Sequence, residues 1–164
     1  MSGTSSPLTL AVEPSGSDAV RWLVGKAEAE LEERYGALAE SELALSVAEF
    51  DLPAGAFVVA RAADTLVGGA GVRPVAPKVA EVKRLWTDPA WRGRGVARAV
   101  MTDLEAVAAD LGYAALWLAT GTRQPEAVAF YANTGWRRLS TDRDGAPLPW
   151  YSIQFAKDLV VNPD

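Results

Sequence analysis

The sequence predicts a single mixed α/β domain, because patterns typical of helices and of strands alternate along its 164 residues. Residues 96–111 carry apolar side chains at steps of three and four, which is typical of an amphipathic helix. Residues 115–119 are almost wholly apolar, as expected of a strand that is covered on both faces. A chain of this length buries roughly 70% of the surface that its unfolded form exposes, so a single hydrophobic core can stabilise it.

The remaining elements follow from the same periodicities and from capping residues. The expected helices cover residues 17–38, 40–50, 96–111 and 126–133. The expected strands cover residues 9–12, 57–61, 65–73, 79–87, 115–119, 136–139 and 150–155. Ser17 is expected to cap the first helix, and Gly112 to follow the third. Pro74 and Pro77 are expected to break the chain before the strand at 79–87.

Composition excludes several kinds of chemistry. The chain has no Cys and no His, which excludes disulfides, thiolate nucleophiles and a serine-hydrolase triad of the usual kind. Its net charge of −5 argues against a nucleic-acid partner. No stretch approaches the ~18 apolar residues that span a membrane, and residues 1–7 lack the features of a signal peptide. We therefore expect a disordered terminus at 1–6, one domain at 7–160, no metal, no membrane partner and a cytoplasmic location.

A glycine-rich turn lies in a basic segment of this acidic chain. Between residues 78 and 98, two acidic residues (Glu81 and Asp88) stand among six basic ones, namely Lys78, Lys83, Arg84, Arg92, Arg94 and Arg98. The turn at 92–97 joins a predicted strand to the clearest helix, whose free N–H groups and dipole suit a phosphate. Its glycines let the backbone come close to such a ligand. A solvated basic face is the alternative interpretation of these charges.

Three phosphate-binding patterns can be compared with this turn. A P-loop requires a Lys followed by Ser or Thr, which the turn lacks. A dinucleotide fingerprint requires a third glycine where Arg98 stands. The pattern Arg/Gln-x-x-Gly-x-Gly/Ala is matched by Arg92, Gly95 and Ala97.

With this pattern, the segment at 79–136 resembles the GCN5-related N-acetyltransferase (GNAT) superfamily. Residues 127–136, Ala-Val-Ala-Phe-Tyr-Ala-Asn-Thr-Gly-Trp, are similar to the second signature of that family, Ala-Ile-x-Leu-Tyr-x-x-x-Gly-Phe. The resemblance implies a GNAT fold, with about six to seven strands, about four helices and a splayed pair of parallel strands. Here the splayed strands are those at 79–87 and 115–120.

The resemblance also implies that acetyl-CoA is the cosubstrate and that its pantetheine adds to the backbone of the strand at 79–87. The pyrophosphate is expected on the N–H groups of the turn, and an amide near Leu85 is expected to polarise the thioester carbonyl. Gln124 stands where many members of the family carry an Asn that contacts the cofactor. The expected cofactor-binding residues are Leu85, Trp86, Thr87, Arg92, Gly93, Arg94, Gly95, Val96, Ala97 and Gln124.

Two residues are candidates for proton transfer. Tyr131 occupies the position of the family's general acid, which protonates the departing CoA thiolate; the alternative is a tyrosine of the core. Glu81 is the candidate base, because it precedes Arg92 by the spacing of the catalytic glutamate in the histone-acetyltransferase branch. A structural ion pair with Lys83 or Arg84 is the alternative for Glu81, and ordered water could then be the base. Because side chains alternate along a strand with a period of two, Glu81, Lys83 and Leu85 are expected to share one face.

The expected reaction is transfer of an acetyl group to a primary amine of a small molecule or peptide. Direct attack is expected, because no Cys is available for an acyl-enzyme. The acceptor pocket is expected between the early helices, the strand end near Trp86, and the last hairpin with Trp150 and Tyr151. The alternatives are an acyl-CoA sensor without turnover and a protein lysine acetyltransferase. The family also suggests a homodimer.

Overall fold

The computed structural model describes residues 7–39, 43 and 45–160. In this part of the chain, seven strands form one sheet in the order β1-β2-β3-β4-β5-β7-β6. The strands are β1 Leu8–Val12, β2 Ala56–Ala62, β3 Thr65–Ala76, β4 Val79–Thr87, β5 Ala115–Gly121, β6 Arg137–Arg138 and β7 Ser152–Asp158. All neighbouring strands are antiparallel except β4 and β5, which are parallel.

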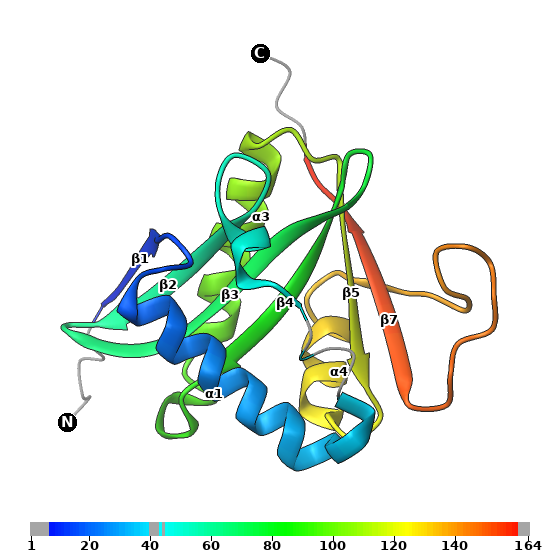
Figure 1. Ribbon diagram of the computed structural model, residues 1–164, viewed down its shortest axis with the longest axis horizontal. Coiled ribbons are helices and arrows are strands. Elements are labelled where there is room, and N and C mark those ends of the chain that lie inside the picture. The colour runs from blue at the N-terminus through cyan, green and yellow to red at the C-terminus, as the bar shows by residue number, and fades with distance from the viewer. Residues whose placement is uncertain (1–6, 40–42, 44, 161–164) are drawn as a thin grey trace.

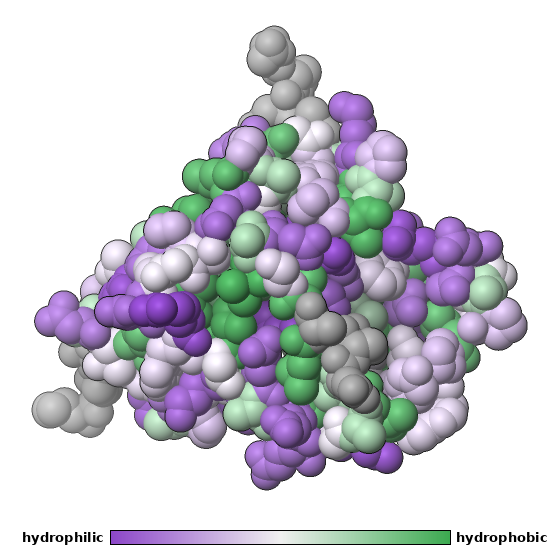
Figure 2. All heavy atoms as spheres, viewed as in Figure 1, coloured by the Kyte–Doolittle hydropathy of each residue, from purple (hydrophilic) through white to green (hydrophobic). Residues whose placement is uncertain are grey.

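Helices cover both faces of this sheet (Figure 1). Helix α1 Asp18–Tyr35 crosses one face and continues into the 3-10 helix η1 Gly36–Ala39. Helices α3 Val96–Asp110 and α4 Pro125–Ala132 cover the opposite face. Two short 3-10 helices, η2 Val47–Phe50 and η3 Pro89–Trp91, complete the described elements. Figure 2, in the same view, shows hydrophilic residues over much of the face on which α1 lies.

Each face of the sheet has its own core. Helix α3 buries Val96, Val100 and Leu104 against the larger cluster, which includes alternate residues of β2, β4 and β5. Helix α1 buries Val20 and Leu23 in a smaller cluster on the other face. Each fully buried aliphatic side chain stabilises the fold by about 1.5–3 kcal/mol, so this alternation fixes which face every strand residue points to.

Most predicted elements are confirmed, with shifted ends. Ser17 caps α1, since its Oγ accepts a hydrogen bond from Val20 N at 3.1 Å. Strand β3 does not stop before Pro74 but runs on to Ala76, because a register shift between Pro74 and Ala76 accommodates the missing N–H group. The last strand begins at Ser152 and not at 150. The helix expected at 40–50 lies partly outside the described residues; its last four residues form η2. The predicted terminus at 1–6 also lies outside them.

Candidate active site

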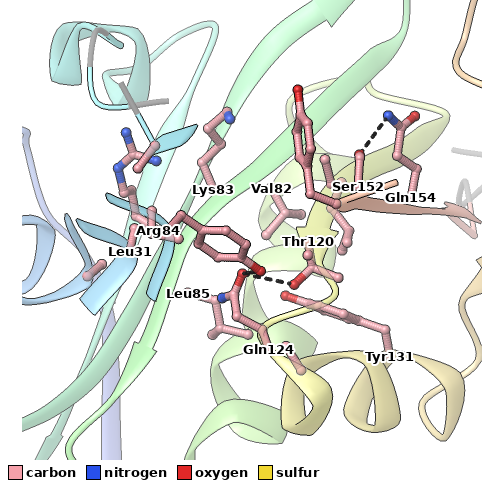
Figure 3. A pocket seen from close by; sticks show the side chains of 18 of the residues that line it. Leu31, Val82, Lys83, Arg84, Leu85, Thr120, Gln124, Tyr131, Ser152 and Gln154 are labelled. Atoms are coloured by element: carbon pink, nitrogen blue, oxygen red, sulfur yellow. Dashed lines mark hydrogen bonds between the residues drawn. The ribbon is translucent and has the colours of Figure 1, made fainter. Parts of the chain in front are cut away.

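The two parallel strands of the sheet separate soon after they begin. Strand β4 pairs with β5 at only three positions, the last of which joins Glu81 to Trp117. Strand β5 meanwhile stays paired with β7 over its whole length. The gap contains a cavity of about 440 Å³, lined from β4 by Val82–Leu85, from β5 by Trp117–Gly121, and also by Gln124 and Tyr131 (Figure 3). The splayed pair that the resemblance implied is therefore present.

A bulge in β4 coincides with the separation. Gly71 faces Lys83 and Gly69 faces Trp86, so Arg84 and Leu85 together oppose Ala70 alone. Arg84 has a φ of 62°, a left-handed conformation that is rare for a side chain of this size. This extra residue lies in the part of β4 that no longer pairs with β5.

The bulge also corrects one expectation about β4. Lys83 lies beside Glu81, with its Nζ 3.3 Å from the carboxylate, but Leu85 packs against the cluster beneath α3. Leu85 therefore does not share a face with the other two, because the period of two is lost at Arg84.

The glycine-rich turn presents free backbone donors at the start of α3. Gly93 and Gly95 have φ values of 79° and 84°, and no atom lies within 4 Å of where either Cβ would be. Within the described residues, the N–H groups at 93–97 donate to no protein acceptor. The first N–H groups of a helix have no partner inside the helix, which makes them suitable donors to an anion. The turn therefore has one property that a pyrophosphate site needs, namely backbone donors with open space beside the two glycines.

Arg92 fixes the turn to its surroundings. Its Nε donates to Thr87 O at 3.0 Å, which ties the turn to the end of β4. Its guanidinium also pairs with Glu30 on α1 at 2.9 Å. Arg94 instead lies over the ring of Trp91, 5.0 Å from its centroid. Of the predicted cofactor-binding residues, only Leu85 and Gln124 line the cavity, and the turn lies outside it.

Tyr131 projects from α4 into the same cavity. Its ring is buried against Phe130, Trp136 and Phe155, with centroids 5.4–5.6 Å away. Figure 3 shows its hydroxyl directed towards Thr120 and Gln124. Burial raises the pKa of Tyr131, so the phenol keeps its proton at every physiological pH. The side chain thus has the packing of a core tyrosine together with a hydroxyl in the cavity.

Glu81 lies beneath the cavity and not in its lining. Its carboxylate is 5% exposed and forms ion pairs with Arg73 Nη1 at 2.6 Å and with Lys83 Nζ at 3.3 Å. Arg73 is itself shared with Glu49 on η2, at 2.8 Å. The structure therefore places Glu81 in an ion-pair network next to the point where the strands separate, and its partner Lys83 lines the cavity. Whether Glu81 is also a base stays a prediction.

Some of the segments that the sequence assigned to an acceptor pocket line this cavity, and others do not. Its walls come from α1 and η1 and from the loop before β7, which contributes Asp142 and Tyr151. Trp150 does not line it and is 68% exposed. Trp86 packs edge-on against Trp22 of α1 and does not line it either.

Sequence reasoning missed Tyr35, which lines the cavity from the last turn of α1. Its hydroxyl donates to Gln124 Oε1 at 3.1 Å, a contact that spans 89 residues of sequence. A helical periodicity could not reveal this contact, because it reports only which face of α1 is buried. The missing Cβ of Gly121 was the one available signal: a methyl group there would lie 1.8 Å from the Tyr35 hydroxyl.

Two further observations describe the molecule as a whole. Among the described residues, no group of three or more Asp or Glu side chains is arranged to hold a metal ion. No helix within the described ranges has the length and apolar character needed to cross a membrane.

Comparison with known proteins shows similarity to acetyltransferases. A model described as the acetyltransferase (GNAT) family matches residues 19–136. A protein of Azospirillum brasilense named IAA acetyltransferase is 33% identical over 129 residues, which cover 78% of this chain and 83% of that protein. Another curated relative is 40% identical over 86 residues, but the match spans only 23% of its length.

Solved structures share the fold. A protein of Klebsiella pneumoniae assigned as an acyl-CoA N-acyltransferase superposes with a TM-score of 0.74 at 21% identity, over 94% of this chain and 99% of that one. The PaiA N-acetyltransferase of Thermoplasma acidophilum, in complex with coenzyme A, gives a TM-score of 0.69 at 16% identity, over 93% of this chain and 99% of that one. At these identities the likeness establishes the fold alone.

Proposed function

Because the chain belongs to the acetyltransferase (GNAT) family, we propose that it transfers the acetyl group of acetyl-CoA to a primary amine of a small molecule or peptide. The observation that carries this proposal is the separation of β4 from β5 after three residue pairs, which leaves unpaired backbone beside a cavity. An extended pantetheine can pair with such an edge as an additional strand would. The free N–H groups at 93–97 lie where the chain leaves β4, so they can hold the diphosphate of the same molecule.

The reaction that we propose is direct attack of the amine nitrogen on the thioester carbon, with formation of the C–N bond and loss of the C–S bond. The amide N–H near Leu85 supports the developing oxyanion. Tyr131 gives its proton to the departing sulfur and regains the proton that the attacking nitrogen loses as the amide forms. Glu81, directly or through water, takes the proton that the attacking ammonium loses. Ion pairs with Arg73 and Lys83 hold the Glu81 carboxylate near the separated strands.

A titration of acetyl-CoA into the purified protein tests the proposal. We expect saturable binding with a Kd well below about 1 mM, because several backbone hydrogen bonds and a diphosphate site contribute together. Absence of measurable heat up to that concentration would end the proposal. Release of free CoA with a library of amines then separates an enzyme from a sensor that binds the donor without turnover. A cytoplasmic location and a homodimer stay predictions of the sequence.

Replacing Gly95 with alanine is expected to weaken acetyl-CoA binding about tenfold. The residue has a φ of 84°, which costs a side-chain-bearing residue about 1–2 kcal/mol, so the turn relaxes and its N–H groups no longer converge. Binding of acetyl-CoA by calorimetry measures the effect. Gly16→Ala is the matched control, because its Cβ also enters open space and its φ lies outside the left-handed region. Equal Kd values for the two variants would show that the turn does not contact the donor.

A further inference from the structure

Tyr35 connects the end of α1 to the end of β5 across the mouth of the cavity. Its side chain is buried and lines the cavity that also contains Tyr131. The ring approaches the backbone of Gly121 so closely that only a residue without a Cβ fits there. Gln124, the residue that it contacts, precedes α4 as its N-cap position but makes no capping hydrogen bond with its side chain. The Gln124 side chain is therefore positioned by Tyr35 and not by a capping hydrogen bond to α4.

The hydrogen bonds around Tyr35 have a defined direction. The backbone N–H of Arg123 donates to the Tyr35 hydroxyl oxygen at 3.1 Å, so that hydroxyl directs its own proton to Gln124 Oε1. Thr120 Oγ1 also approaches Gln124 Oε1, at 3.4 Å (Figure 3). Burial raises the pKa of Tyr35, so the proton stays on its hydroxyl.

This direction determines which end of the Gln124 amide is free. An amide can be rotated by half a turn at little cost unless its partners distinguish oxygen from nitrogen. Here two hydroxyl groups approach Oε1, and the proton of Tyr35 can only be accepted by oxygen. The Nε2 group donates no hydrogen bond within the described part of the chain, and Gln124 lines the cavity. Its two N–H donors are thus available to a carbonyl group in the cavity.

We propose that Tyr35 is a positioning residue, which fixes the Gln124 carboxamide so that its Nε2 group donates to a carbonyl of the acyl-pantetheine. The inference rests on the proposed function, because it needs acetyl-CoA in this cavity. According to this proposal, α1 helps to hold the donor, because Tyr35 at its end positions the Gln124 amide.

Besides the bond from Arg123 N to the Tyr35 hydroxyl, the loop has contacts that do not involve Tyr35. Arg34 Nη1 donates to Arg123 O at 3.1 Å, and Arg123 Nη1 donates back to Arg34 O at 3.0 Å. Arg34 also pairs with Glu126 in the first turn of α4. Removal of the hydroxyl should therefore release the side chain of Gln124 and cost the loop one backbone contact, while the contacts through Arg34 and the Arg123 side chain keep the backbone in place.

The test is the affinity for acetyl-CoA of the variant Tyr35→Phe, measured by calorimetry. We expect Kd to rise about tenfold, since one hydrogen-bond donor to a partly buried amide is lost. Gln124→Ala should raise Kd by a similar factor. The double variant should bind no more weakly than Gln124→Ala alone, because the inference has Tyr35 act on the donor through that amide.

Tyr113→Phe is the matched control. It also removes a tyrosine hydrogen bond, to Ala54 O at 2.6 Å, but Tyr113 does not line the cavity, so its Kd should equal that of the wild type. If the wild type binds acetyl-CoA and Tyr35→Phe binds it equally well, the inference is overturned and the proposed function stands. Multiplicative losses in the double variant would also overturn it. If the wild type does not bind acetyl-CoA, the proposed function fails with it.

Discussion

Replacing Tyr131 with phenylalanine is expected to lower kcat about 100-fold and to leave the Kd for acetyl-CoA unchanged. General acid catalysis contributes roughly 10²–10⁴ in rate, and a thiolate is a moderate leaving group, so the lower end of that range applies. The ring keeps its contacts with Phe130, Trp136 and Phe155, and only the hydroxyl in the cavity is lost. Stopped assays of CoA release, with the best acceptor from an amine library, measure the effect.

The pH dependence gives a second test of the same residue. The acid form of Tyr131 is the protonated one, and burial raises its pKa above the ordinary value of 10.0. Ionisation of Tyr131 therefore removes activity only above that value, and kcat should not fall on its account between about pH 7 and about pH 10. Tyr113→Phe controls for loss of a tyrosine hydroxyl elsewhere. Full activity in Tyr131→Phe would leave this residue as part of the core alone.

Replacing Glu81 with glutamine is expected to lower kcat/KM for the acceptor about 100-fold and to destabilise the fold by about 3 kcal/mol. The first effect follows from loss of the base, and the second from loss of the two ion pairs that the buried Glu81 carboxylate makes with Arg73 and Lys83. Thermal unfolding and a pH–rate profile measure the two effects separately.

Glu49→Gln is the matched control for the ion-pair network. Glu49 pairs with the same arginine at 2.8 Å but is 38% exposed, so its loss should cost less than about 1 kcal/mol and leave the rate unchanged. If Glu81→Gln is unstable and yet keeps the wild-type rate and pH profile below its melting temperature, its carboxylate is structural. Water would then be the base.

The sequence predicted the order of elements well, because each depends on local periodicity. Helix α3 and strand β5 have strong apolar patterns, and their positions follow from residues close together in the chain. The glycine turn was also readable, since a left-handed φ at Gly93 and Gly95 and free N–H groups at a helix start are local properties. The bulge at Arg84 was not, because it arises from how β4 pairs with β3 around Ala70.

The candidate site was predictable only where a signature covers it. Tyr131 and Gln124 lie in or next to such a signature, and the structure brings both into one cavity. The ion-pair network around Glu81 also includes Arg73 of β3 and Glu49 of η2, which are not adjacent to Glu81 in the sequence. Tyr35 reaches Gln124 across 89 residues, and no local pattern encodes a contact of that span. Tertiary contacts between polar side chains were thus the part that the sequence did not disclose.

The shortness of the β4–β5 ladder has a mechanical consequence. Strands β3 and β4 pair at seven positions, and β5 and β7 also pair at seven. The ladder between β4 and β5 has only three residue pairs. The sheet thus consists of two well-paired parts joined by a short ladder. The cavity lies beyond the end of that ladder, where β4 and β5 are no longer paired. A donor that pairs with the free edge of β4 supplies partners that β5 does not, so acetyl-CoA should slow amide exchange in the unpaired part of β4.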